Sequence, residues 1–172
     1  MPAPIILLST ISLNLATLSR LFLLGLSLAL FSSVIHAQIT QVQLLTFGKI
    51  VVLDNSVQYS LRVEPDGRVR RNAAFVLIED PKPAIFHFSQ LPANTSFSIQ
   101  VDEENDGVTL FSEVGQPTAL FTIQPFFSFS SYRTNQHGEA EVPMGGILTT
   151  SGDGKLYHDG TYYRSFNIFV NF

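Results

Sequence analysis

A two-residue alternation of apolar and polar side chains runs through the end of this chain and recurs earlier in it. In 162–172 the apolar set shares one face, with Arg164 the exception: Tyr162, Phe166, Ile168, Val170 and Phe172. Ser56–Val63 alternates in the same way, with Val57, Tyr59, Leu61 and Val63 on one side. Because side chains repeat every two residues on an extended strand, both segments are predicted to be half-buried β-strands. No segment after Ala37 has the apolar spacing of a helix.

Further strands are predicted between turn-forming residues. The candidates are 69–78, 84–91, 96–101, 108–114, 119–130 and 141–150. The run Glu64–Gly67 (EPDG) predicts a turn, because Pro fixes φ, Asp bonds its own backbone and Gly supplies a positive φ. Segments 96–101 and 108–114 flank an acidic turn and are expected to form a hairpin, whereas 131–139 is expected to be an exposed loop. Pro125 places the middle of its strand at an edge or a bulge. Many short strands between turns predict an all-β chain, a sandwich or a barrel.

Residues 21–37 (LFLLGLSLALFSSVIHA) have the order of a secretory signal. Arg20 precedes an apolar run from Leu21 to Phe31, and the small residue Ala37 ends the segment. A positive head, an apolar centre and a small-residue cleavage site define such a signal. The run is shorter than the ~20 apolar residues of a membrane-spanning helix. We therefore expect a signal helix in 1–37, cleavage after Ala37, and one mature domain in 38–172.

The leader has one irregular feature, because residues 1–19 carry no positive side chain. A membrane anchor that merged residues 4–35 would place Arg20 in its middle, at a cost of roughly 3 kcal/mol. We favour a true start near Leu18, which gives a short basic head before the apolar run. Membrane contact is then expected only through the leader, before cleavage.

The composition of the mature part bounds its class. Cleavage after Ala37 leaves 135 residues, a length that fits one domain with a normal core. The 9 Lys and Arg and 14 Asp and Glu of this part give a net charge of −5, which argues against nucleic acid as a partner. The chain has no cysteine, so a hydrophobic core rather than disulfides must stabilise it outside the cell.

Four segments carry a resemblance to a known family. They are 45–51 (LTFGKIV), 142–148 (VPMGGIL), 159–163 (DGTYY) and 166–172 (FNIFVNF). Together they resemble the bacterial domain-of-unknown-function family numbered 4402. Its members have an L-x-F-G segment soon after a signal peptide, a V-G-G-T-L-like strand, and an end of the form G-x-Y-x-G-x-F-x-V-x-V-x-Y.

The chain departs from this family pattern at two places. Ile147 stands where the family usually has Thr, and Tyr163-Arg164 replaces a small residue and Gly. The resemblance implies an exported, immunoglobulin-like antiparallel β-sandwich, similar to spore-coat-U-like proteins and to subunits of chaperone–usher pili. It implies no known activity.

One segment nearly matches a calcium loop. In Asp102–Glu113, the residues Asp102, Asp106, Gly107 and Glu113 fit the pattern D-x-[DN]-x-[DN]-G-x5-E, and Glu104 substitutes at the third position. If 108–113 is extended, Glu113 lies roughly 20 Å from the turn at ~3.3 Å per residue and cannot close the site. We interpret the segment as a solvated turn. A looser calcium site of three carboxylates in 102–106 is the alternative.

No residue is assigned a catalytic, cofactor-binding or metal-binding role. Cleavage leaves His87, His137 and His158, of which only His158 has a carboxylate, Asp159, beside it in sequence. The chain contains neither G-x-S-x-G nor H-E-x-x-H. We therefore expect that the protein is not an enzyme, has no cofactor and has no small-molecule substrate.

Two surface features are expected. The arginines of Arg68–Arg71 follow a turn and are interpreted as a charged strand end that discourages edge pairing. Phe126, Phe127 and Phe129 do not all fit one face of a regular strand, and Phe169 opposes its apolar neighbours. Exposed aromatic side chains of this kind mark subunit contacts in other proteins.

Three functional hypotheses follow. The favoured one is an exported protein of the periplasm, cell surface or medium, with a structural or interaction role and with itself or another surface subunit as partner. The second is a pilus-type or coat subunit that polymerises by strand complementation. Against it stands the short N-terminus, because only Gln38–Gln43 precede the first expected strand and leave little spare chain to donate. The third is a small outer-membrane β-barrel, which a terminal Phe172 on an alternating strand fits.

Overall fold

The computed structural model describes residues 37–102, 108–109, 111–112 and 119–171. The chain divides into two units, Met1–Ile35 and His36–Phe172, and all described residues belong to the second. Every element of the described part is a β-strand, and every pairing in it is antiparallel, which confirms the predicted all-β class. Of the expected signal segment 1–37, residues 1–36 lie outside the described residues. In the described part, no helix is long and apolar enough to span a membrane.

The strands, in chain order, are β1 (Gln38–Gln43), β2 (Ile50–Val52), β3 (Ser60–Val63), β4 (Val69–Arg71), β5 (Phe75–Leu77), β6 (Ala84–Ser89), β7 (Ser96–Val101), β8 (Val108–Thr109), β9 (Phe111–Ser112), β10 (Thr122–Phe127), β11 (Ser131–Arg133), β12 (Ala140–Thr149), β13 (Tyr162–Tyr163) and β14 (Ile168–Asn171).

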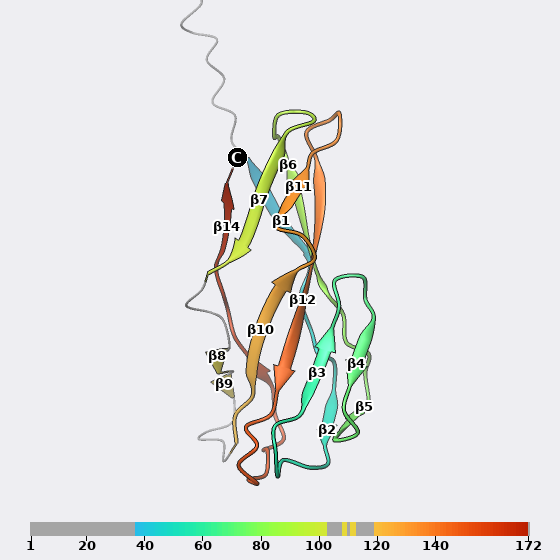
Figure 1. Ribbon diagram of the computed structural model, residues 1–172, viewed down its shortest axis with the longest axis vertical. Helices are drawn as coiled ribbons and strands as arrows, with labels where there is room; N and C mark the ends of the chain where they lie inside the picture. Colours follow the sequence, from blue (N-terminus) through green and yellow to red (C-terminus); the bar gives the residue numbers. More distant parts are fainter. Residues whose placement is uncertain (1–36, 103–107, 110, 113–118, 172) are drawn as a thin grey trace, which may run out of the picture. The chain divides into compact units, whose positions relative to one another are not determined.

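The long strand β12 organises the main sheet, whose order is β1-β6-β12-β10-β8 (Figure 1). Its first half, from Ala140 to Met144, pairs with β6, and its second half, from Gly146 to Thr149, pairs with β3. Along its other edge β12 pairs with β10. Strand β4 pairs with β3 and extends the sheet further. One strand therefore joins two halves of the domain.

Three small sheets lie against the main sheet: β11-β7-β14, β13-β9 and β2-β5. Side chains two or four positions apart on a strand share a face. On β12, Val142 and Met144 belong to one core cluster, and Leu148, on the same face, belongs to a second. The first cluster is completed by Phe97 and Ile99 of β7, and the second by Phe75 of β5 together with residues of β3 and β10. The small sheets thus cover one face of the main sheet, which is a sandwich.

Several predicted details are confirmed. Gly67 takes a φ of 85° and its amide donates to the carbonyl of Glu64 (2.9 Å), which closes the predicted turn between β3 and β4. From Tyr162 to Asn171, half-buried and exposed residues alternate without exception, as the sequence pattern predicts. Strand β10 has β8 beside it only at Thr122 and Ile123, so Pro125 has β12 on one side and no described strand on the other.

Three predicted elements are wrong. The hairpin of 96–101 with 108–114 does not form, because β7 pairs with β11 and β14 while β8 pairs with β10. The strand predicted at 69–78 is divided into β4 and β5, because Asn72 binds the amide of Ser60 and the chain then turns Phe75 into the second core. The loop predicted at 131–139 begins with strand β11, whose Tyr132 packs on Phe97.

Candidate binding groove

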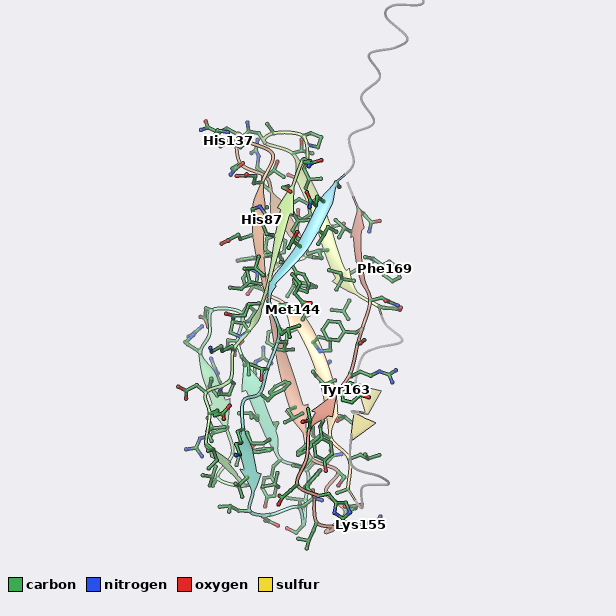
Figure 2. All side chains as sticks on the ribbon, turned by 180° about the vertical axis from the view of Figure 1, so that it is seen from behind. His87, His137, Met144, Lys155, Tyr163 and Phe169 are labelled. Atoms are coloured by element: carbon green, nitrogen blue, oxygen red, sulfur yellow. The ribbon has the colours of Figure 1, made fainter. Side chains whose placement is uncertain are left out.

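A groove of about 990 Å³, lined by both apolar and polar residues, opens on the covered side of the main sheet, in the half of the domain that contains the second core. One wall is the segment 44–52, which includes β2, and the other wall is the segment 156–166, which includes β13. Its floor contains Phe121 and Ile123, next to and on β10, and Leu148 of β12. Figure 2 shows this side, with β2 and Tyr163 of β13 lying on either side of β12.

The edge of β2 that borders the groove has no described partner strand. Strand β2 pairs only with β5. On either side of β2, the amide of Leu53 donates to the carbonyl of Ala74 (2.8 Å) and the carbonyl of Lys49 accepts from the amide of Ile78 (2.7 Å), so Val51 between them also directs its backbone groups to β5. Because backbone groups alternate between the two edges of a strand, those of Ile50 and Val52 point to the groove.

Two glycines position the first wall. Gly48 has a φ of 71°, and a Cβ on it would lie 2.1 Å from the carbonyl oxygen of Glu79, so only glycine lets the chain pass there. A Cβ on Gly146 of β12 would lie 2.8 Å from Leu45 Cδ2 and 3.1 Å from Phe47 Cζ. Because Gly146 has no side chain, Leu45 and Phe47 can pack directly on the backbone of β12.

The second wall is held by aromatic packing. The ring of Tyr157 stacks on Phe121, with centroids 4.0 Å apart and planes inclined by 14°. Tyr162 meets the same Phe121 edge-on, with centroids 5.1 Å apart. Such pairs contribute about 0.5–1.5 kcal/mol beyond the area they bury. The floor and the wall are thus joined through one ring.

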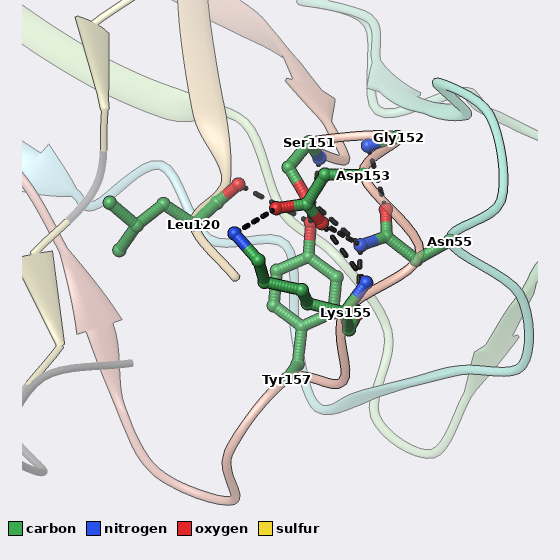
Figure 3. Close-up of polar contacts among 7 residues, drawn as sticks. All are labelled: Asn55, Leu120, Ser151, Gly152, Asp153, Lys155 and Tyr157. Atoms are coloured by element: carbon green, nitrogen blue, oxygen red, sulfur yellow. Dashed lines mark hydrogen bonds and ion pairs between the residues drawn. The ribbon is translucent and has the colours of Figure 1, made fainter. Parts of the chain in front are cut away.

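A polar network fixes the Tyr157 hydroxyl (Figure 3). This hydroxyl accepts a hydrogen bond from the amide of Ser151 (2.8 Å) and donates one to the carbonyl of Leu120 (3.3 Å). Asn55, only 8% exposed, contacts the turn at 151–155, although it lies about 100 positions earlier in the chain. Its amide nitrogen donates to Ser151 Oγ (2.9 Å), Asp153 Oδ1 (3.1 Å) and the Lys155 carbonyl (2.9 Å), and its Oδ1 accepts from the Gly152 amide (2.8 Å).

Asp153 is the ionised centre of this turn. The backbone amide of Lys155, the hydroxyl of Ser151 and the Lys155 side chain lower the pKa of Asp153 to about 2. The Lys155 ammonium lies 3.1 Å from Asp153 Oδ2, but both groups are exposed enough for water to weaken this pair. The turn is therefore held mainly by hydrogen bonds to a charged acceptor, which are stronger than neutral ones.

The sequence-predicted histidines do not converge with one another. His87 lies on β6, His137 lies in the loop between β11 and β12, and His158 lines the groove beside Asp159. In the part of the chain that the structure describes, no group of three or more His, Cys, Asp or Glu side chains is arranged to hold a metal ion. Of the calcium-loop candidates, Glu104, Asp106, Gly107 and Glu113 lie outside the described residues, so that hypothesis stays untested.

The other predicted surface features have clear places. Arg68 lies 2.6 Å from Asp66 and Arg70 lies 3.5 Å from Glu64, so the arginines pair with carboxylates at the end of β4. Among the described strands β4 pairs with β3 alone, which agrees with a charged edge. Phe129 is 68% exposed and Phe169 is 50% exposed, as the strand pattern predicts.

Sequence reasoning did not find the network around Asn55. The composition of Ser151–Lys155 (SGDGK) is that of a turn, and that signal was available. Nothing local marks Asn55, because its partners lie 96 to 100 positions away in the chain. The groove was likewise not predicted, because its walls come from the two ends of the domain.

Comparison with known proteins identifies the family that the sequence motifs resemble. Residues 37–172 match the family model described as a domain of unknown function (DUF4402). The chain belongs to this family. The match confirms the resemblance carried by 45–51, 142–148 and the C-terminal segments, of which the first forms part of one groove wall. No curated protein and no solved structure matches the chain significantly.

Proposed function

We propose that this DUF4402 protein is exported and acts in the periplasm, on the cell surface or outside the cell, as a structural or interaction protein. Two observations support export. The segment 21–37 has the order of a secretory signal, and the family match begins at residue 37, where the signal is expected to end. The absence of cysteine leaves the domain independent of disulfide formation after export.

The observation that carries the proposed role is the groove beside the free edge of β2. A groove with an apolar floor and an unpaired strand edge fits an extended protein segment, which pairs its backbone with the edge and inserts alternate side chains. The charged residues near it, Lys49, Glu79 and Arg164 among them, carry both signs. This mixture gives no preference for a strongly charged ligand, and the net charge of −5 opposes nucleic acid.

A non-enzymatic role is part of the proposal. The sequence has no nucleophile motif of the G-x-S-x-G type and no H-E-x-x-H motif, and the groove contains the single histidine His158. We infer that recognition, rather than chemical conversion, is the work of this surface.

The second candidate function is that of a subunit that polymerises by strand complementation. The specific observation in its favour is that Ile50 and Val52 direct backbone groups into the groove, where a donated strand would pair with them. The sequence argument against it was the short N-terminal segment. In the structure the first strand begins earlier than expected, because Gln38–Gln43 is itself strand β1 and pairs with β6 at the edge of the main sheet.

The test is the fate and assembly state of the full chain. The protein is produced with its own leader, the cells are fractionated, and envelope and medium are run unboiled and boiled on a gel with intact-mass measurement. Exported protein that begins at Gln38 supports the proposal, and a ladder of multimers that collapses on boiling selects the polymerising subunit. Protein retained in the cytoplasm with residues 1–37 attached would overturn the proposal.

A further inference from the structure

We propose that a second, smaller pocket, beside the edge of β10, binds a neutral saccharide. The pocket has a volume of about 350 Å³ and lies between the end of β7 and the end of β10 (Figure 1). It shares no lining residue with the groove. The inference therefore goes beyond the proposed function and does not depend on what the groove binds.

The edge of β10 at this pocket is not suited to an added strand. Pro125 lines the pocket, and it has β12 on one side and no described strand on the other. Proline has no N–H to donate to a neighbouring strand, and at a sheet edge it discourages pairing. We therefore expect a compact ligand rather than an extended protein segment. The volume lies within the ~300–1,000 Å³ that is usual for small-molecule pockets.

The lining carries little charge. Among the described residues that line the pocket, Asp102 is the only ionisable one. An anionic ligand would meet this carboxylate and no Lys, Arg or His of the described lining, which disfavours it. The other polar side chains are neutral amides and hydroxyls: Gln100, Gln124, Ser128 and Ser130. Amides and hydroxyls both donate and accept hydrogen bonds, so they suit a ligand whose own polar groups are hydroxyls.

The same lining offers aromatic surface. Phe126, Phe127 and Phe129 all line the pocket, but their surroundings differ. The Arg62 guanidinium lies over the ring of Phe126, 4.1 Å from its centroid, and Phe127 packs against the first core. Phe129 is 68% exposed, and its ring meets that of Tyr132 edge-on, with centroids 6.0 Å apart. Phe129 therefore offers the most accessible ring of the three.

The ring of Phe129 is held in place although it is exposed. Tyr132, which contacts it, packs in turn on Phe97 of the first core, with centroids 6.2 Å apart. A ring that is already positioned loses little freedom when a ligand binds to it. A sugar ring has C–H groups on its faces and hydroxyls around its rim. The C–H face packs on the face of Phe129, which is electronegative, while the hydroxyls bind the amides of Gln100 and Gln124.

Nuclear magnetic resonance of the isotope-labelled, exported product tests the proposal. The probes are four neutral disaccharides: maltose, lactose, mannobiose and N,N′-diacetylchitobiose. We expect at least one of them to shift the side-chain amides of Gln100 and Gln124 and the backbone amide of Phe129 in a saturable way. The amides of Ile50 and Val52 in the groove should not move. Absence of saturable shifts at the pocket with all four disaccharides would overturn the proposal.

Two exposed phenylalanines provide matched variants. Phe129→Ala removes the ring from the pocket, whereas Phe169→Ala removes an exposed ring outside the pocket lining. We expect Phe129→Ala to weaken disaccharide binding about tenfold and Phe169→Ala to leave it unchanged. Gln124→Ala, at an exposed position of β10, removes a hydrogen-bonding group without touching a ring and should also weaken binding. Urea unfolding checks that each variant is folded. Unchanged affinity in both pocket variants would overturn the proposal.

Further probes separate the ligand class and its source. Glycerol has hydroxyls but no ring, and a saturable shift of the pocket residues by glycerol equal to that by a disaccharide would contradict a saccharide site. A hexaproline peptide that shifted these residues while the disaccharides did not would overturn the proposal in favour of peptide recognition. Release of the protein from washed cell envelopes by the bound disaccharide would support a surface glycan as the ligand. Disaccharide binding without retention on envelopes would support a free sugar.

Failure of this inference can be told apart from failure of the proposed function. A chain that stays in the cytoplasm with its leader attached but binds a disaccharide would reject the proposed function alone. An exported chain whose pocket residues respond to none of the four disaccharides would reject this inference alone.

Discussion

Asn55 and Asp153 lie 98 positions apart in the chain and are joined by a hydrogen bond of 3.1 Å from Asn55 Nδ2 to Asp153 Oδ1. This bond ties the loop after β2 to the turn after β12. The same turn holds the Tyr157 hydroxyl, whose ring forms part of the groove. The two walls of the groove are therefore connected through a buried amide as well as through the floor.

Asn55→Ala removes a side chain that makes four hydrogen bonds to the turn at 151–155. Because these partly buried hydrogen bonds are lost and Asn55 then holds the turn only through the bond from the Gly154 amide to its own carbonyl (2.8 Å), we expect a loss of about 2–4 kcal/mol in the free energy of unfolding. Urea unfolding at neutral pH measures it. Asn171→Ala, at an exposed position on β14, is the control and should change stability by less than about 0.5 kcal/mol. Equal effects of the two substitutions would contradict the role of Asn55.

The lowered pKa of Asp153 predicts the pH range in which this carboxylate stops stabilising the turn. A carboxyl whose folded-state pKa is about 2, against an ordinary value of 3.8, stabilises the fold above the ordinary value, and this contribution is lost as the pH falls toward 2. Asp153→Asn should therefore lower stability at neutral pH and should lose less stability than the wild type between about pH 4 and 2.

The measurement is the urea midpoint of both proteins from pH 7 to 2. The pKa values of Asp54 and Asp66 are also lowered, by hydrogen bonds from Tyr59 and from the Arg68 amide respectively. Both groups remain in the variant, so the difference between the two curves isolates Asp153. Curves that run parallel through this range would show that Asp153 does not hold the turn.

Gly48 and Gly67 form a matched pair for backbone strain. Both have a positive φ, of 71° and 85°, but a Cβ on Gly67 would meet nothing within 4 Å. We expect Gly67→Ala to cost about 1 kcal/mol from its φ alone. Gly48→Ala also forces the Glu79 carbonyl away and should cost about 3 kcal/mol or more. Thermal unfolding compares them, and similar losses would mean that the approach to Glu79 is not needed for the wall.

Substitutions at Tyr157 distinguish the contribution of its ring from that of its hydroxyl to the second wall. Tyr157→Phe keeps the stacked ring on Phe121 and removes the hydroxyl that binds Ser151 and Leu120, so we expect a loss of about 1 kcal/mol. Tyr157→Ala removes the ring as well and should cost about 3 kcal/mol. Near-ultraviolet circular dichroism and urea unfolding report both effects. If Tyr157→Phe were as costly as Tyr157→Ala, the hydroxyl network rather than the ring would hold the wall.

The local features of this fold were accessible from sequence, because a period of two and turn residues are local signals. The alternation from Tyr162 to Asn171 and the turn at Glu64–Gly67 were predicted for this reason. The pairing of strands was not accessible in the same way. Segment 96–101 was paired with its neighbour in sequence, whereas burial of Phe97 and Ile99 in the first core selects β11 and β14 as its partners.

The groove shows the same limit. The family motif at 45–51 identified Leu45, Phe47 and Gly48 as characteristic residues, but not that Leu45 and Phe47 would rest on Gly146. Asn55 carried no signal at all, since its role depends on a turn that folds against it from the far end of the domain. Contacts over such separations are decided by packing rather than by local pattern.

Hydrogen exchange at three neighbouring amides tests the central claim most directly. In a single copy, the amide of Val51 faces β5, whereas those of Ile50 and Val52 face the groove. The assembled and the monomeric protein are compared at the same pH. A strand bound in the groove predicts that Ile50 and Val52 become protected in the multimer alone, while Val51 is protected in both. Equally fast exchange of Ile50 and Val52 in the multimer would contradict the account.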